Sequence, residues 1–167
     1  MDFLKHQITG LEYSDPEIFK KEIEYIFNKT WQYFCQVSEL SEAGSYITAT
    51  LGTEPIIILK ASDGKLRAFH NVCPHRGARM LLGSGTCKGI VCPYHSWSFT
   101  ENGTLNHIPK RQRFGDIDVE SLNLRPASVD TWRGLVFASP ILDIEPLASR
   151  RICSAPAPRR AAGECRG

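Results

Sequence analysis

The chain has 167 residues, a length that suits one domain with a hydrophobic core better than two domains of ordinary size. Hydrophobic residues make up 42% and charged residues 23%, which are values of soluble globular proteins and exclude a collagen-like or largely disordered chain. The formal net charge of +2 is too small to indicate a nucleic-acid or membrane partner, so we expect neither.

The N-terminal segment lacks the apolar run of a secretory signal, and no stretch approaches the roughly 20 apolar residues of a membrane span. We therefore expect a cytoplasmic protein. Without a signal peptide, irregularly spaced cysteines favour metal binding or free thiols over a disulfide framework. The six cysteines are Cys35, Cys73, Cys87, Cys92, Cys153 and Cys165.

Residues 14–30 predict an amphipathic helix. Ser14 or Asp15 can cap it, and Pro16 suits its first turn. We expect the apolar stripe of this helix to pack against the rest of the domain. The stripe consists of Ile18, Phe19, Ile23, Ile26 and Phe27.

From Trp31 onward, short β-rich runs alternate with Gly, Pro, Asp-Gly and Asn-Gly, a pattern typical of an antiparallel all-β domain. The pairs Asp63-Gly64 and Asn102-Gly103 predict two hairpins, with type I′ turns in which both central residues have positive φ. Expected strands cover residues 32–37, 46–51, 55–60, 65–70, 90–92, 96–100, 104–106, 127–131 and 134–138.

The last 20 residues differ in kind from the rest. Residues 148–167 are rich in Arg, Ala, Pro and Gly and have almost no large apolar side chains, so we expect a disordered tail. A non-native end, such as a frame-shifted one, is the alternative. The predicted organisation is therefore a lead-in with the first strand over residues 1–40, a domain over 41–147, and this tail.

The chemistry is carried by two short segments, Cys73-x-His75 and, 16 residues later, Cys92-x-x-His95. Each offers one thiolate and one imidazole, and a proline after each cysteine, Pro74 or Pro93, stiffens the turn. Two Cys and two His are the ligand set of a Rieske-type 2Fe-2S cluster. Neutral imidazoles on one iron leave such a cluster less negative, with a potential of roughly −150 to +300 mV rather than about −400 mV.

Two alternatives stay open at this point. Structural zinc also accepts two Cys and two His, although its common ligand pairs are of like residues, such as Cys-x-x-Cys. The four residues could also be unrelated core and loop positions. The paired spacing, with Pro and Gly in place, favours the iron-sulfur interpretation.

The segments FHNVCPHRGARM and IVCPYHSWSF, with Gly44-x-Tyr46 before them and Gly103-x-Leu105 after, resemble a known family. They are similar to the N-terminal Rieske domain of the large (alpha) subunit of Rieske non-haem iron oxygenases, the aromatic-ring-hydroxylating type, over about residues 12–147. The resemblance implies an all-β fold with a short N-terminal helix, namely an antiparallel β-sandwich with a cluster-binding subdomain. It implies cluster ligands Cys73, His75, Cys92 and His95, supported by Pro74, Arg76, Gly77, Pro93, Tyr94 and Trp97.

Sequence differences from other kinds of Rieske protein narrow the range of families that this chain resembles. The respiratory cytochrome bc type has a disulfide between the loops, where this chain has Ala78 and Tyr94, and a serine where it has Trp97. A lower-potential, oxygenase-type centre is implied. Free-standing Rieske ferredoxins share the loops and remain the alternative, although the helical lead-in resembles the alpha-subunit start.

In the resembled family, oxygenation needs a second domain whose mononuclear iron is held by two His and a carboxylate. After His95 the only histidine is His107, so we expect the catalytic domain to be absent and the isolated chain to transfer electrons without hydroxylating a substrate.

The implied partners are a reductase or ferredoxin donor and, in the full-length protein, other subunits of a homo- or hetero-oligomer. Arg76 and Arg79 are candidates for meeting a reductase, with a solvated face as the alternative. Cys35 and Cys87 are interpreted as ordinary thiols.

Overall fold

The computed structural model describes residues 10–149. Residues 150–167 of the expected tail, with Cys153 and Cys165, lie outside that range. Within the described range, no helix is long and apolar enough to cross a membrane.

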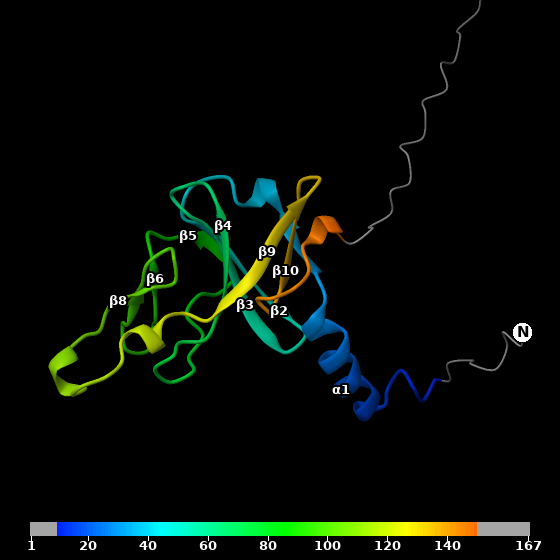
Figure 1. Ribbon diagram of the computed structural model, residues 1–167, viewed down its shortest axis with the longest axis horizontal. Coiled ribbons are helices and arrows are strands. Elements are labelled where there is room, and N and C mark those ends of the chain that lie inside the picture. The colour runs from blue at the N-terminus through cyan, green and yellow to red at the C-terminus, as the bar shows by residue number, and fades with distance from the viewer. Residues whose placement is uncertain (1–9, 150–167) are drawn as a thin grey trace, which may run out of the picture.

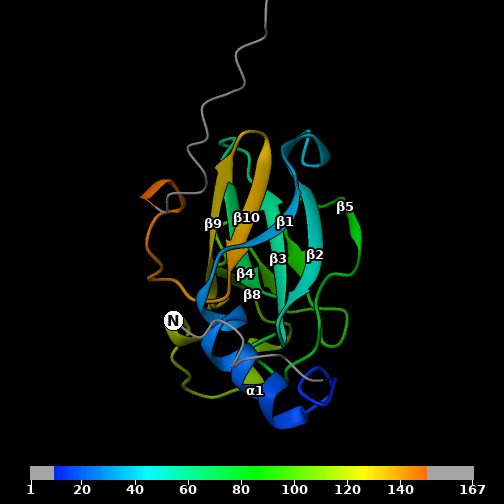
Figure 2. The same cartoon turned by 90° about the vertical axis from the view of Figure 1, so that its right-hand side faces the viewer.

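The described chain is built from a curled seven-stranded antiparallel sheet, in the order β1-β10-β9-β4-β3-β2-β5, and a three-stranded sheet, β6-β7-β8 (Figures 1 and 2). The predicted fold class, all-β with a short N-terminal helix, is confirmed. The strands are β1 (Gln32–Gln36), β2 (Ser45–Leu51), β3 (Glu54–Lys60), β4 (Leu66–His70), β5 (Ser84–Thr86), β6 (Ile90–Val91), β7 (Ser98–Phe99), β8 (Leu105–His107), β9 (Pro126–Trp132) and β10 (Leu135–Ser139). Short 3-10 turns lie at Phe27–Lys29, Val37–Glu39, Arg111–Arg113, Glu120–Leu122 and Leu147–Ser149.

Every predicted strand overlaps an observed one, but β5 was not predicted. Its sequence, Ser84-Gly85-Thr86, is exposed and has no apolar alternation, so no pattern marks it as a strand. It becomes a strand because its backbone pairs with β2, where Tyr46 lies opposite Gly85. Backbone pairing with β2, rather than the intrinsic strand propensity of its residues, therefore makes β5 a strand.

Strand β3 lies between two hydrophobic cores and contributes side chains to both. Successive side chains of a strand point to opposite faces, so a continuous apolar run is buried on both sides. Ile56 and Ile58 belong to a core inside the curled sheet, together with Cys35 and Val136. Ile57 and Leu59 face the other way, into the core that includes Cys73, Cys92, Trp97 and Phe99. The second core joins the large sheet to the small one and places the candidate ligands at that junction.

The N-terminal helix α1 covers Pro16–Tyr25 and is shorter than predicted. Asp15 caps it, since its carboxylate accepts a hydrogen bond from the Glu17 N–H group at 2.8 Å. The expected packing of its apolar stripe was wrong, because none of the helix residues is buried and the Phe19 side chain is 57% exposed. The helix lies at the end of the sheet beside the β2–β3 turn rather than across a face of the sheet (Figure 1). A Cβ added at Gly52, in that turn, would meet the Ile23 side chain of the helix at 3.5 Å.

Both predicted hairpins form, but their turn type was wrong. Ala61 accepts a hydrogen bond from the Gly64 N–H group, and Thr100 accepts one from Gly103, while only the glycine of each turn has positive φ. Each is a turn followed by a left-handed glycine, which is the three-residue hairpin loop. Positive φ at both central residues occurs instead at Arg133 and Gly134, between β9 and β10.

The two glycine turns allow a matched test of packing. Gly103 and Gly64 have φ of +79° and +80°, so alanine strains the backbone similarly at both positions. A Cβ at Gly103 would overlap the ring of Phe69, whereas a Cβ at Gly64 meets nothing within 4 Å. We expect Gly103→Ala to lower the free energy of unfolding by about 1–3 kcal/mol more than Gly64→Ala. Urea denaturation of the two variants measures the difference, and equal losses would show that Phe69 yields without cost.

Candidate functional site

Two loops of equivalent backbone conformation supply the candidate ligands. The first loop, residues 73–78, follows β4, and the second loop, residues 92–97, follows β6. In each, the cysteine N–H group donates to the carbonyl five residues on, and its carbonyl accepts from the N–H group four residues on. The bonds are Cys73 to Ala78 (2.9 Å) and Gly77 to Cys73 (2.9 Å), and Cys92 to Trp97 (2.8 Å) and Ser96 to Cys92 (2.9 Å).

The fourth residue after each cysteine, Gly77 or Ser96, has a left-handed backbone, with φ of +70° and +58°. This conformation turns each loop back on its cysteine. The histidine occupies the second position after Cys73 but the third after Cys92. The two loops have nearly the same backbone, but one carries its imidazole at the second position after the cysteine and the other at the third.

The two thiols lie together at the base of the loops. Cys73 and Cys92 are only 2% and 1% exposed. Burial is the main cause that raises the pKa of Cys73; the His75 N–H group, which donates to its sulfur, lowers it, and the adjacent Cys92 thiol raises it. The raised pKa means that the Cys73 thiol keeps its proton, which a bound metal would release.

The two imidazoles lie together as well. The ring centroids of His75 and His95 are 4.7 Å apart at an interplanar angle of 67°. The His75 ring stacks on Trp97, with centroids 4.6 Å apart and planes 2° apart, and it meets the Phe114 ring edge to face, with centroids 5.8 Å apart. Burial, followed by the charges of His95 and Arg76, lowers the pKa of His75. The ring is therefore held neutral, which is the form that binds metals.

The Nδ1 atom of His75 is buried and has no hydrogen-bond partner. A buried ring nitrogen without a partner is unfavourable, and it calls for a specific explanation. Coordination to a metal would supply the missing partner. The residues present therefore fit a metal-containing group at this position.

The four candidate ligands are arranged as a thiol pair and an imidazole pair. Among residues 10–149, no three His, Cys, Asp or Glu side chains surround a point where a single metal ion could be held. A tetrahedral zinc site needs its four ligands around one ion, whereas a two-iron cluster takes two ligands on each iron. The paired arrangement suits the second.

The supporting residues predicted from the sequence lie on the same two loops. Pro74, Arg76, Pro93 and Tyr94 are exposed at the surface. The Tyr94 ring lies 3.8 Å from that of His95, centroid to centroid, and is 60% exposed. Gly77 provides the left-handed turn and Trp97 is buried beneath His75. Arg79 is exposed just beyond the first loop.

Asn71 fastens the first loop and was not singled out from the sequence. It is 1% exposed, its Oδ1 atom accepts from the N–H groups of Met80 (2.9 Å) and Leu81 (3.2 Å), and its Nδ2 donates to the Leu81 carbonyl at 2.7 Å. These bonds tie the two ends of the loop together. The available signal was a lone amide directly after the buried strand β4 and two residues before Cys73.

Phe114 was also missed, because it lies in a segment without periodic pattern. We call residues 109–123 the arm. Arg111 stabilises the arm internally, since its guanidinium donates to the carbonyls of Gly115 (2.7 Å) and Ile117 (3.5 Å).

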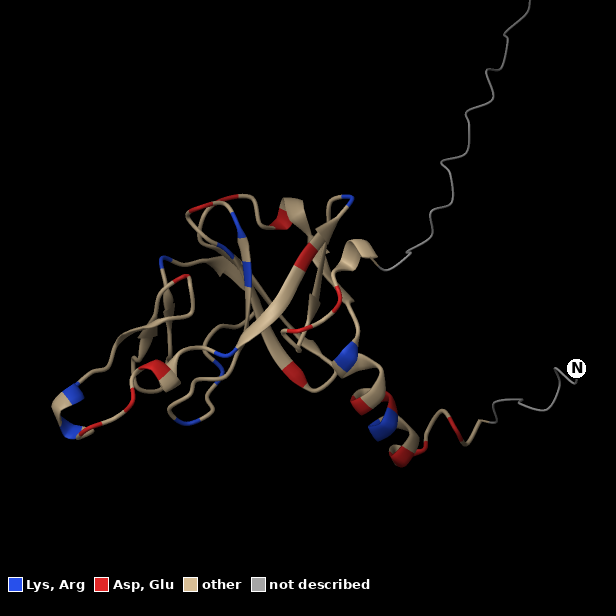
Figure 3. Cartoon of the chain, in the orientation of Figure 1, with Lys and Arg blue, Asp and Glu red and all other residues tan. Residues whose placement is uncertain are grey.

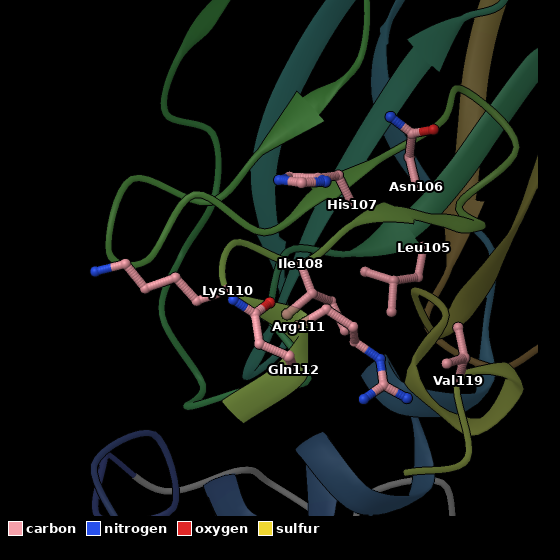
Figure 4. A pocket seen from close by; sticks show the side chains of 8 residues that line it. All are labelled: Leu105, Asn106, His107, Ile108, Lys110, Arg111, Gln112 and Val119. Carbon is pink, nitrogen blue, oxygen red and sulfur yellow. The ribbon is translucent and has the colours of Figure 1, made fainter. Parts of the chain in front are cut away.

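A cavity of about 370 Å³ lies between β8 and the arm (Figure 4). Its lining is Leu105, Asn106, His107, Ile108, Lys110, Arg111, Gln112 and Val119, so it is separate from the four candidate ligands.

Cys35 lies in the core inside the curled sheet, away from the two loops, and Cys87 is half-buried. Burial, and then the charge of Glu39, raises the pKa of Cys35 to about 11. At pH 8 only about one thiol in a thousand is then ionised, and the thiolate is the reactive form. We expect iodoacetamide to leave Cys35 unmodified in the folded protein and to alkylate it in urea, as read by peptide mass spectrometry. Rapid labelling without urea would show that β1 opens.

The sequence and structure were compared with those of known proteins. Residues 30–131 match the family model described as the Rieske [2Fe-2S] domain. The carnitine monooxygenase oxygenase subunit of Escherichia coli K12 is 37% identical over 126 residues, which are 75% of this chain and 34% of that protein. The large oxygenase component of the naphthalene 1,2-dioxygenase system of Pseudomonas aeruginosa is 36% identical over 137 residues, 80% of this chain and 30% of that protein.

Solved structures give the same result. A quaternary ammonium Rieske monooxygenase in complex with L-carnitine superposes with a TM-score of 0.78 at 35% identity, over 83% of this chain and 40% of that one. Naphthalene 1,2-dioxygenase with bound indole superposes with a TM-score of 0.77 at 32% identity, over 83% of this chain and 32% of that one. The chain spans about a third of the length of the curated relatives.

Proposed function

Since this chain belongs to the Rieske [2Fe-2S] domain family, we propose that it carries single electrons through a 2Fe-2S cluster held by Cys73, His75, Cys92 and His95. The observation that carries the proposal is the thiol pair and imidazole pair, with the unpartnered Nδ1 of His75 between two equivalent loops. When bound, a cluster with this ligand set accepts and releases one electron at a potential of roughly −150 to +300 mV.

The surrounding residues of this chain would tune the site. The N–H groups of His75 and Arg76 donate to the Cys73 sulfur, where they favour its negative charge. Trp97 and Phe114 cover part of the His75 ring, which is half-buried. His95 is exposed, so the second imidazole is open to a partner.

We also propose that the chain acts as the N-terminal, electron-delivering part of an oxygenase alpha subunit. Relatives named for carnitine and for naphthalene match it almost equally well, at 37% and 36% identity. Oxygenases named for two such different molecules share this segment, which suits a role in electron delivery rather than in substrate choice. The receiving centre would be a mononuclear non-haem iron held by two His and a carboxylate in a further domain.

In this proposal the donor is a reductase or ferredoxin, and the full-length protein is an oligomer. One related quaternary ammonium Rieske monooxygenase is described as showing inter-subunit electron transfer. The isolated chain is expected to form no hydroxylated product from carnitine or naphthalene with reductant and oxygen. Product formation would refute that part of the proposal.

Metal analysis of the purified chain tests the electron-transfer proposal. Iron, acid-labile sulfide and zinc are measured on the same anaerobic preparation. We expect about two irons and two sulfides per chain, as a binuclear cluster requires. One zinc with no iron or sulfide would overturn the proposal in favour of a structural zinc module.

A further inference from the structure

Three side chains fasten the segment that follows β10. We call residues 140–149 the exit segment (Figure 1, orange). Within residues 10–149, no backbone hydrogen bond joins the exit segment to a strand, and each of the three side chains contacts one of its carbonyl groups instead. The contacts are His70 Nε2 to Pro140 (3.0 Å), Ser128 Oγ to Leu142 (2.8 Å) and Trp31 Nε1 to Glu145 (2.8 Å). The position of the exit segment therefore depends on side-chain donors.

Of these three donors, only His70 belongs to a residue type that titrates near neutral pH. Its ring is 3% exposed, and both ring nitrogens face an acceptor. Nε2 lies 3.0 Å from the Pro140 carbonyl oxygen, and Nδ1 lies 3.0 Å from a Glu54 carboxylate oxygen. A neutral imidazole has one N–H group and can donate to only one of them. The ring and the carboxyl together must therefore hold one proton more than a neutral imidazole and a free carboxylate hold.

Loss of this extra proton would remove one of the two hydrogen bonds of His70. A hydrogen bond to a carboxylate is stronger than one to a neutral carbonyl, so the single remaining N–H group favours Glu54. Nε2 would then turn a lone pair toward the Pro140 carbonyl oxygen, which leaves two acceptors facing each other in a buried site. Movement of the exit segment away from the ring relieves that contact.

The charges around the His70 contacts are mainly negative. After Pro140 the exit segment carries Asp143 and Glu145 and no basic residue, and Figure 3 shows only acidic positions along it. Arg125, whose carbonyl accepts from the His70 backbone N–H group at 2.9 Å, is exposed and is the basic residue on that side. Within residues 10–149, the only salt bridge that any of these residues forms is the one between His70 and Glu54. This surrounding favours a proton on the pair.

We propose that His70 and Glu54 form a proton-dependent latch on the exit segment. While the pair holds its extra proton, the Pro140 carbonyl is bound and the exit segment lies against the domain. As the proton leaves at rising pH, the exit segment is released. The closed state binds this proton more tightly than the open state, so acid closes the latch and base opens it. The latch is independent of the proposed electron-transfer function, since none of the four candidate ligands takes part in it.

The Trp31 indole N–H group reports the state of the latch, because it donates to the exit segment at Glu145, away from the His70 ring. NMR of the full chain in its oxidised state measures the solvent-exchange rate of this group at pH 6 and at pH 8.5. The rate is divided into that of an unfolded reference peptide to give a protection factor at each pH. We expect the factor to be at least about tenfold lower at pH 8.5, since a hydrogen bond to a charged group is lost. Equal protection at both pH values would overturn the proposal.

Glu54→Gln is the decisive variant, because it keeps His70. The glutamine amide can donate to Nδ1 of a neutral ring while Nε2–H still donates to the Pro140 carbonyl, so no extra proton is needed. Protection of the Trp31 indole in this variant should stay within about twofold between pH 6 and pH 8.5. A fall as large as that of the wild type would contradict the latch.

The matched control is His107→Gln, which removes an exposed histidine on β8 that has no contact with the exit segment. This variant should keep the full pH dependence of the wild type. If His107→Gln abolished the pH dependence, the proton would not act through His70 and the proposal would fail. The ¹⁵N shifts of the His70 ring add a direct reading, because both nitrogens should be protonated at pH 6 in the wild type. A single protonated ring nitrogen together with an ionised Glu54 carboxylate at pH 6 would also contradict the latch.

Discussion

Replacing Cys92 with serine is expected to lower the iron and sulfide content of the purified chain at least about tenfold. Cys92 is 1% exposed and lies beside Cys73. A side chain at the protein surface therefore cannot take the place of its thiolate as a ligand. A serine hydroxyl is a poor ligand for ferric iron compared with a thiolate. Because metal binding and folding are coupled, the variant should also unfold at a lower urea concentration than the loaded wild type. Colorimetric iron and sulfide assays and a urea titration measure both effects.

The control for this prediction is Cys87→Ser. Cys87 lies between the two loops in sequence but is half-buried and belongs to neither ligand pair. It should keep the full iron and sulfide content. Loss of iron in Cys87→Ser, or its retention in Cys92→Ser, would contradict the assignment of the four ligands.

Replacing Asn71 with alanine is expected to cost about 3 kcal/mol or more of the free energy of unfolding. The substitution leaves the N–H groups of Met80 and Leu81 and the Leu81 carbonyl without their side-chain partner. Each buried polar group without a partner costs about 1–3 kcal/mol. The first loop should also lose its fixed ends, so iron content should fall together with stability. Urea denaturation and iron analysis of the same preparation give both values.

Asn106→Ala is the matched control, because Asn106 is exposed and makes one long contact, 3.4 Å to the Ser98 hydroxyl. Its free energy of unfolding should stay within about 0.5 kcal/mol of the wild type, as for surface substitutions generally. If Asn71→Ala were equally mild, Asn71 would not be fastening the loop.

The features predicted well from the sequence are local ones. Strand β3 and its neighbours were found because apolar runs bounded by turn residues are a direct consequence of strand geometry. The candidate ligands were found because both loops carry their cysteine, proline and histidine within a few residues of one another. The structure brings the two loops together as predicted, although the role of the four residues as ligands stays a prediction.

The features that could not be predicted depend on contacts between distant segments. Phe114 reaches His75 from 39 positions along the chain, through an arm without any periodic pattern. The buried His70 ring lies 3.0 Å from a Glu54 carboxylate oxygen and 3.0 Å from the Pro140 carbonyl, and neither partner is close in sequence. The apolar stripe of α1 misled the prediction for the related reason that periodicity shows which residues share a helix face but not what covers it.

Pulsed EPR of the dithionite-reduced chain, grown with ¹⁵N-labelled histidine, tests the central claim most directly. The account predicts about one unpaired spin per chain, coupled to two labelled imidazole nitrogens, with one coupling or the whole signal lost in His95→Ala. A spin with no coupling to labelled nitrogen would show that histidines do not ligate the iron. If the purified chain contained zinc and gave no EPR signal after reduction, that result would contradict the electron-transfer function itself.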